Sequence, residues 1–177
     1  MTDGAQPVGR GIGPALEAHD VLAVLRNDPA APQDLRARAI DLPAGLIELV
    51  QKLSARDARI KASEALENGN ARRKLEAICL AQGGLREPPR APHTHPILAA
   101  HAGMVANIDN RVLAKIAKLA GAPNAKAAGL EFHTPLGVQV ETGTPLFTVH
   151  AESRGELAYA LEYVRAHPGV IRLEDDA

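Results

Sequence analysis

The spacing of apolar residues divides the chain into two parts. Up to about residue 84, aliphatic side chains recur every three or four positions, which is the period of an amphipathic helix. Pro43 interrupts one of these runs, so we expect either two short helices or one kinked helix there. The pattern predicts helices over residues 14–25, 33–53, 55–66 and from about 71 to Gly83.

Beyond residue 84 the apolar segments become shorter and alternate around Gly and Pro. Residues 85–95 are rich in proline, which favours extended backbone and predicts a linker. Asp109 and Ser153 are each expected to cap the start of a helix, because their side chains can accept hydrogen bonds from exposed backbone N–H groups. The pattern predicts strands at 97–102, 104–108, 129–132, 138–140, 146–150 and 170–173.

The segment from Glu141 to Pro145 has turn composition and lies between two predicted strands, which indicates a β-hairpin. The predicted fold class is therefore α+β, with an N-terminal helical segment followed by a small α+β domain. We place the parts at residues 1–84, 85–95 and 96–177, with the linker in the middle.

Charge and cysteine content narrow the classes of partner and compartment. Twenty basic residues against twenty-one acidic ones leave a net charge of −1, which argues against binding to nucleic acid or to an anionic membrane. Cys79 is the single cysteine, so an internal disulfide is impossible and a reducing compartment fits. No stretch approaches the roughly 20 apolar residues of a membrane span. We therefore expect a cytoplasmic protein.

The glycine-rich stretch from Gly9 to Pro14 is the first candidate site. It superficially resembles a dinucleotide-binding fingerprint, but that motif needs a preceding strand and an acidic residue after a second strand. We interpret it as a tight connection into the first helix. A further hypothesis is that its backbone carbonyls, with a carboxylate such as Glu17 or Asp20, coordinate a monovalent cation.

The histidines and lysines give weaker signals. Alternate histidines could bind zinc from an extended strand, but no Cys or carboxylate lies nearby to complete the site, so exposed linker residues are the preferred interpretation. These are His93, His95 and His101. Two further histidines, His133 and His150, lie at predicted strand ends, where a surface or supporting role is expected. The group of Lys115, Lys118 and Lys126 is expected to form a solvated helix face.

Four stretches together resemble the C-terminal portion of thymidine phosphorylase and of the related pyrimidine-nucleoside and AMP phosphorylases. They occur in the family's order, and the similarity extends over nearly the whole chain. The ending Gly13-Pro14 and the triplet Asp109-Asn110-Arg111 are most similar to the AMP-phosphorylase-like branch. The stretches are residues 3–17, 109–111, 117–123 and 137–153.

This resemblance implies a homodimeric glycosyltransferase, a pentosyltransferase, in which phosphate attacks the anomeric carbon of a nucleoside and releases the base. Residues 1–84 would complete the helical part of the family's large α/β domain, and residues 96–177 would form its C-terminal domain. The family's phosphate-binding and base-binding residues lie upstream of the matched region. The chain is therefore expected to hold no catalytic residue and to meet phosphate and nucleoside only together with the missing part.

The resemblance also implies potassium binding by the backbone carbonyls of Val8 and Gly11 with the side chain of Asp20. Asp20 departs from the family, which has the longer Glu at that position. An alternative from another class is a non-catalytic binding or assembly module, because the segment from Gly137 to Val149 resembles the lipoyl and biotinyl hammerhead. A carrier of that kind needs a lysine in its turn, whereas residues 141–144 contain none.

Overall fold

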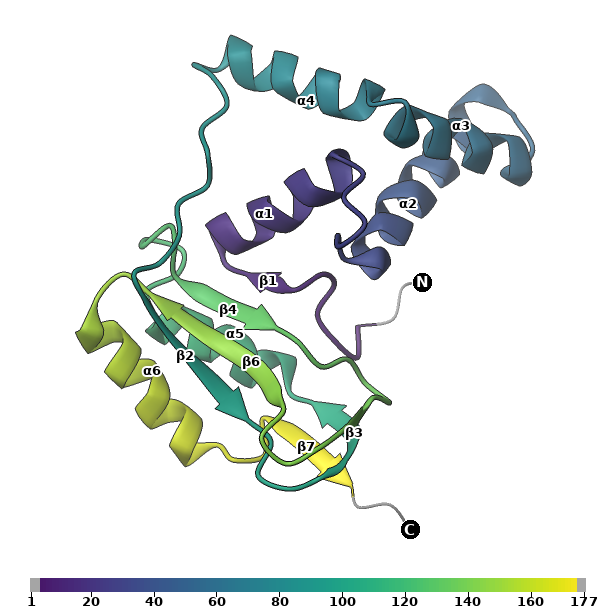
Figure 1. Ribbon diagram of the computed structural model, residues 1–177. Coiled ribbons are helices and arrows are strands. Elements are labelled where there is room, and N and C mark those ends of the chain that lie inside the picture. The colour runs from purple at the N-terminus through teal and green to yellow at the C-terminus, as the bar shows by residue number, and fades with distance from the viewer. Residues whose placement is uncertain (1–3, 175–177) are drawn as a thin grey trace. The chain divides into compact units, whose positions relative to one another are not determined.

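The computed structural model describes residues 4–174 and divides the chain into two compact units (Figure 1). We call residues 19–87 the helical unit. Residues up to 18, together with those from 88 onward, form the sheet unit. None of the described helices is long and apolar enough to cross a membrane.

The helical unit contains the second half of α1 (Pro14–Leu25) and the helices α2 (Gln33–Gln51), α3 (Ala55–Glu67) and α4 (Asn70–Ala81). Small side chains dominate its core, which allows α2 and α3 to approach closely. The N-cap of α3 is Ser54, whose hydroxyl accepts a hydrogen bond from the N–H of Asp57 at 3.1 Å. The buried core consists of Val24, Ala31, Ile40, Ala44, Ala62 and Leu66.

Pro43 lies inside α2 without splitting it. The alternative of two short helices is therefore wrong. Proline removes one backbone donor, but Ile40 and Ala44 on either side of it are both buried in the core of the unit. Packing on that face keeps the helix continuous from Gln33 to Gln51.

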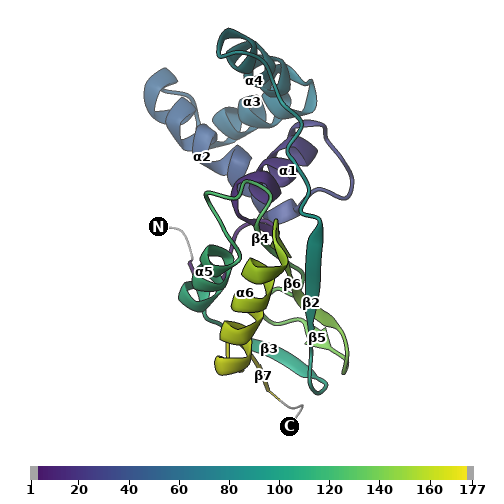
Figure 2. The same cartoon turned by 90° about the vertical axis from the view of Figure 1, so that its left-hand side faces the viewer.

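The sheet unit contains two antiparallel sheets. The four-stranded sheet has the order β1-β4-β6-β2, and the three-stranded sheet has the order β5-β3-β7. Helices α5 (Asn110–Leu119) and α6 (Arg154–Ala166) cover one face of the four-stranded sheet (Figure 2). The strands are β1 (Gly11–Ile12), β2 (His93–Leu98), β3 (Gly103–Ile108), β4 (Gly129–Phe132), β5 (Gln139–Val140), β6 (Pro145–Ala151) and β7 (Ile171–Glu174).

The buried core of the sheet unit is aliphatic apart from two phenylalanines. Strands β4 and β6 contribute to it because their alternate side chains point toward the helices. Its largest fully buried side chains are Val105, Leu113, Ile116, Leu130, Phe147 and Val149. The α+β fold class predicted from the sequence is confirmed.

Both predicted helix caps are present. The carboxylate of Asp109 accepts hydrogen bonds from the N–H groups of Arg111 and Val112, each at 3.0 Å. The hydroxyl of Ser153 accepts from the N–H of Glu156 at 3.2 Å and donates to the Glu156 carboxylate at 2.8 Å. Caps depend only on neighbouring residues, which is why the sequence predicts them well.

The predicted hairpin between residues 138 and 150 does not form. Strand β5 pairs with β3, whereas β6 pairs with β2 on one side and β4 on the other. The turn itself is present, since the N–H of Thr144 donates to the carbonyl of Glu141 at 3.0 Å. Both hydrogen-bonding edges of β6 are already occupied, so β5 joins the other sheet.

Two further features concern the proline-rich stretch and the start of the chain. Strand β2 begins at His93, so the last three residues of the stretch 85–95 belong to a sheet. The glycine-rich segment forms strand β1, which pairs with β4, and Gln6 accepts a hydrogen bond from the N–H of Leu136 at 2.8 Å. The first 18 residues are therefore grouped with the sheet unit and not with the helices that follow.

Candidate functional site

Two glycines at the junction of β1, α1 and β4 have no room for a side chain. A Cβ atom on Gly11 would lie 2.3 Å from the carbonyl carbon of Leu16, and one on Gly129 would lie 2.1 Å from the carbonyl oxygen of Ile12. The N–H of Phe132 donates to the carbonyl of Arg10 at 2.7 Å. These glycines permit a close approach of backbone segments, in line with the interpretation of the segment as a tight connection into α1.

The three residues expected to contribute to a potassium site lie in different environments. Val8 is exposed in a bend, Gly11 lies in β1, and the side chain of Asp20 on α1 is buried, with 7% of its surface exposed. Among residues 4–174, no three His, Cys, Asp or Glu side chains gather as a metal site. A site built from backbone carbonyls would not be of that type, so potassium binding by Val8, Gly11 and Asp20 stays a prediction.

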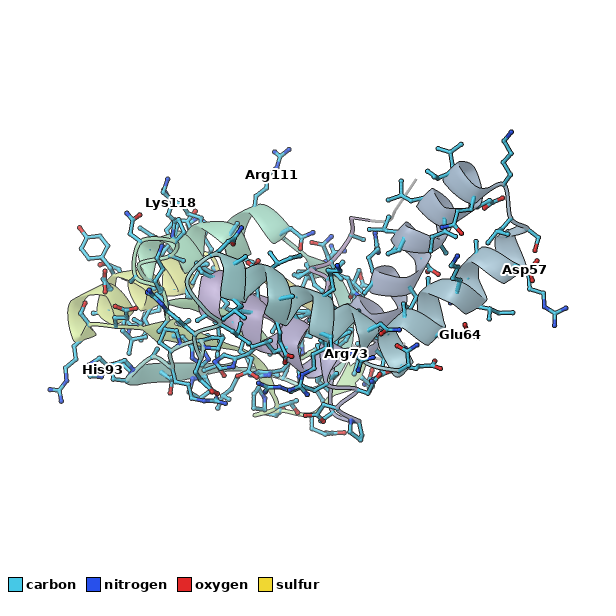
Figure 3. All side chains as sticks on the ribbon, turned by 90° about the horizontal axis from the view of Figure 1, so that it is seen from above. Asp57, Glu64, Arg73, His93, Arg111 and Lys118 are labelled. Carbon is cyan, nitrogen blue, oxygen red and sulfur yellow. The ribbon has the colours of Figure 1, made fainter. Side chains whose placement is uncertain are left out.

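The histidines considered for zinc do not belong to a metal-binding group of three or more His, Cys, Asp or Glu side chains among residues 4–174. His93 and His95 lie on β2, and the Nδ1 atom of His101 is 2.9 Å from the carbonyl oxygen of Ala102. The lysines of the α5 region are exposed, as expected for a solvated face. Figure 3 shows Lys118 and Arg111 projecting outward from that helix.

A group of polar side chains lies on the face of the four-stranded sheet opposite the helices. On β6, Thr148 and His150 alternate with the buried Phe147 and Val149, so they point to the other side of the sheet. Glu131 on β4 pairs directly with Thr148. We call Glu131, His133, Thr148 and His150 the polar sheet face.

Two specific interactions link the members of the polar sheet face. Nε2 of His133 is 2.8 Å from Oγ1 of Thr148, a hydrogen bond whose direction depends on the histidine tautomer. Nε2 of His150 lies 3.6 Å from Oε2 of Glu131, which is ion-pair distance but longer than a hydrogen bond. The sequence pattern indicated only the two histidines. Their partners Thr148 and Glu131 can be identified only when the strand register is known.

The electrostatics of the polar sheet face favour a charged Glu131 and a neutral His133. The neighbouring His150 lowers the pKa of Glu131 below its usual value, with smaller contributions from His133 and Arg10. Partial burial lowers the pKa of His133, and the positive charges of His150 and Arg10 act in the same direction, while Glu131 opposes them. A neutral imidazole beside a hydroxyl can donate and accept hydrogen bonds with a polar ligand.

A shallow pocket of about 460 Å³ adjoins the polar sheet face. His133 and Thr148 form part of its wall, together with Thr134, whose hydroxyl donates to the carbonyl of Pro145 at 3.0 Å. Hydroxyl, amide and imidazole groups converge here between proline and valine side chains. The remaining wall residues are Pro96, Val138, Gln139, Val140, Thr144 and Pro145.

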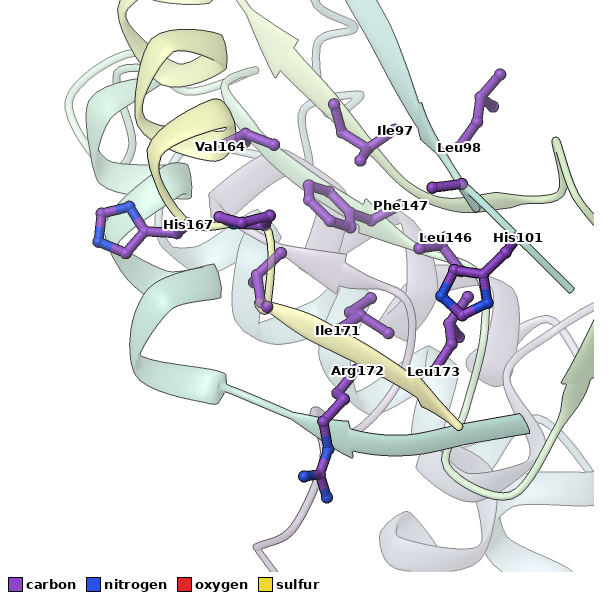
Figure 4. Close-up of a pocket in the computed structure, with 14 residues that line it drawn as sticks. Ile97, Leu98, His101, Leu146, Phe147, Val164, His167, Ile171, Arg172 and Leu173 are labelled. Carbon is purple, nitrogen blue, oxygen red and sulfur yellow. The ribbon is translucent and has the colours of Figure 1, made fainter. Parts of the chain in front are cut away.

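A second pocket of about 390 Å³ lies between strands β2, β6 and β7 and the end of α6 (Figure 4). Its walls are mostly apolar, with Phe147 and Ile171 in the interior. Figure 4 shows the His167 ring and the Arg172 guanidinium at the outer margin of the pocket. This arrangement offers apolar contact area but brings no group of titratable side chains together inside the pocket.

Comparison with known proteins identifies relatives over the entire chain. Residues 104–169 match the model of the pyrimidine nucleoside phosphorylase C-terminal domain. The chain is 54% identical over 177 residues to a protein of Hahella chejuensis named "Putative thymidine phosphorylase", covering 100% of this chain and 35% of that one. Proteins with the same name from Chelativorans sp. and Sphingopyxis alaskensis are 53% and 56% identical over 174 residues, covering 98% of this chain and 34% of theirs.

The chain thus spans about a third of the length of these relatives. The matched domain model covers most of the sheet unit, including α5, β4, β6 and α6. The family that the sequence motifs resemble is the same one that these comparisons find. Over its whole length the chain resembles the C-terminal portion of the thymidine phosphorylase and pyrimidine nucleoside phosphorylase family, and residues 104–169 match the C-terminal domain of the latter.

Proposed function

We propose that this chain supplies the C-terminal part of a nucleoside phosphorylase that acts on thymidine or a related nucleoside or nucleotide. The observation that carries the proposal is 54% identity along the whole chain to a relative named for that activity. In the reaction, a phosphate oxygen bonds to the anomeric carbon while the bond from that carbon to the base nitrogen breaks. The base leaves with the electron pair and takes up a proton, giving free base and sugar 1-phosphate.

Catalysis of this kind depends on holding phosphate and sugar together and on stabilising the charge of the departing base. The family resemblance assigns the groups that do so to the part of the relatives that this chain does not span. We therefore propose that the chain is inactive alone and contributes structure to the complete enzyme. We further propose that the complete enzyme is a homodimer of the cytoplasm.

The potassium hypothesis fits the same scheme. The carbonyls of Val8 and Gly11 and the carboxylate of Asp20 would supply part of a coordination shell, and the part of the relatives that this chain does not span would supply the rest. With the other part present, Asp20→Asn should raise the potassium concentration needed for half-maximal activity. Substitution of sodium for potassium serves as the reference condition. An unchanged potassium requirement in the variant would remove Asp20 from the site.

The main test joins this chain to the part it does not span. We would co-express it with the remaining two-thirds of the Hahella chejuensis relative and follow phosphate-dependent release of thymine from thymidine, uracil from uridine and adenine from AMP. Each polypeptide alone is the control. Activity in the pair but in neither part alone is expected. Activity of this chain alone would contradict the proposal, and an inactive pair would favour a non-catalytic assembly module.

A further inference from the structure

Helix α2 is apolar on two opposite sides, only one of which is buried by the described chain. Ile40 and Ala44 face the core of the helical unit. At 100° per residue, Leu42, Leu46 and Leu49 fall on the other side of the helix. They are exposed, with 64% of the surface of Leu46 accessible, and Val50 beside them is 75% accessible. A helix apolar on both sides normally has a partner on each.

The exposed residues form a ridge beside a groove. Leu42, Leu46 and Val50 are spaced four apart and make one continuous row along α2, which we call the α2 ridge. The row next to it, Leu35 to Ile47, lines a groove of about 260 Å³ within the helical unit. The other lining residues are apolar as well: Val21, Val24, Leu25, Ala62, Ala65, Leu66 and Ala71. A ridge alongside a groove is the surface that another helix packs onto.

Two ion pairs join charged residues of α2 to charged residues of α3. Arg59 forms a close ion pair with Asp41, and the guanidinium of Arg36 lies 3.6 Å from the carboxylate of Glu67. The surface fits an apolar helix face.

We propose that the α2 ridge and its groove bind an apolar helix face of the part of the phosphorylase that this chain does not span. The inference rests on the proposed function. The relatives carry this segment in one polypeptide nearly three times as long, of which it makes up 34–35%. A surface joined covalently to its partner meets it at an effective concentration in the millimolar range, which favours a partner in the same polypeptide.

The test measures binding without nucleoside or phosphate. We would titrate this chain with the purified remaining two-thirds of the Hahella chejuensis relative and compare Leu46→Glu/Val50→Glu with the wild type by calorimetry. The matched control is Tyr159→Glu on α6, because Tyr159 is similarly exposed at 67% but lies in the sheet unit. We expect the ridge variant to weaken binding by at least about tenfold and the control to change it less than about twofold.

Several outcomes decide the proposal. Wild-type affinity in the ridge variant would overturn it, and so would a change from dimer to monomer at unchanged affinity, which would assign the ridge to a second copy. Far-UV circular dichroism verifies the fold, and if the glutamates reduce helicity, Leu46→Gln/Val50→Gln must show the same loss of affinity. This experiment measures binding alone, whereas the co-expression experiment above measures activity. A complex that binds fully here but is inactive there would refute the proposed function and leave this inference standing.

Discussion

Glu131 and His150 lie on neighbouring strands with Oε2 of the carboxylate 3.6 Å from Nε2 of the imidazole. The register of β4 and β6 brings them together, since Glu131 pairs with Thr148 and Gly129 pairs with His150. His133 and Arg10 add to the field at this place. The polar sheet face is therefore the part of the sheet unit whose stability should respond most directly to pH.

The first prediction concerns His133, whose pKa lies below its ordinary value of 6.5, chiefly because of burial. The folded state disfavours the charged imidazole, so its contribution to stability is complete above pH 6.5 and is lost as pH falls through the lowered pKa. Titration of the His133 ring protons by NMR should give a midpoint below 6.5. A midpoint at or above that value would contradict the prediction.

The variant Glu131→Gln tests which neighbouring groups set the pKa of His133. The charge of Glu131 raises the pKa of His133 and so opposes the effect of burial. In Glu131→Gln the titration midpoint of His133 should therefore move lower still. Glu131 itself has a lowered pKa, so its contribution to stability is present above about pH 4.5 and disappears as pH falls below that value.

The features that sequence predicts well are local, and those it misses depend on pairing between distant residues. Asp109 and Ser153 cap their helices because each needs only the backbone two or three positions ahead. The hairpin was a local prediction too, but strand pairing is decided by competition among all available edges, and β6 is already paired on both. Likewise, the approach of Glu131 to His150 follows from a register that no single segment encodes.

The period-two alternation of β6 is the signal that could have found more of the candidate site. Thr148 and His150 are polar, whereas Phe147, Val149 and Ala151 between and after them are apolar. This pattern indicates a strand with one solvent-facing side. It identifies which residues share a face, but their partners on β4 still require the structure.

The second prediction is that Gly129→Ala severely destabilises the sheet unit. A Cβ there would lie 2.1 Å from the carbonyl oxygen of Ile12, and the φ of Gly129 is +149°. Since backbone atoms cannot yield as a flexible side chain does, we expect a loss of more than about 2 kcal/mol in the free energy of unfolding. Tyrosine fluorescence during urea unfolding reports on this unit, because both tyrosines lie on α6.

The matched control for this variant is Gly137→Ala. Gly137 also has a positive φ of +77°, but a Cβ there would meet nothing within 4 Å. Only the cost of a left-handed backbone remains, about 1 kcal/mol. Equal losses for the two variants would show that the backbones of β1 and β4 are less closely packed than the structure indicates.

The third prediction is that Asp109→Ala destabilises the sheet unit by about 1 kcal/mol, because α5 loses the acceptor for two backbone N–H groups. Asp109→Asn keeps a side-chain oxygen at the same place and should retain most of the stability. The same tyrosine signal measures both. If the Asn variant is as unstable as the Ala variant, the cap acts through its charge and not through its hydrogen bonds.

The fourth prediction is a gain of stability from Gly45→Ala in α2. Gly45 lies inside the helix, and a Cβ there would meet nothing within 4 Å. Alanine loses less backbone freedom on folding than glycine, so the helical unit should gain about 0.5–1 kcal/mol. Gly83→Ala, after the end of α4, is the control of opposite sign, since its φ of +103° favours glycine. Circular dichroism at 222 nm follows the unfolding of these helices, and a loss of stability in Gly45→Ala would mean that this side of α2 is covered by a contact too close for a methyl group.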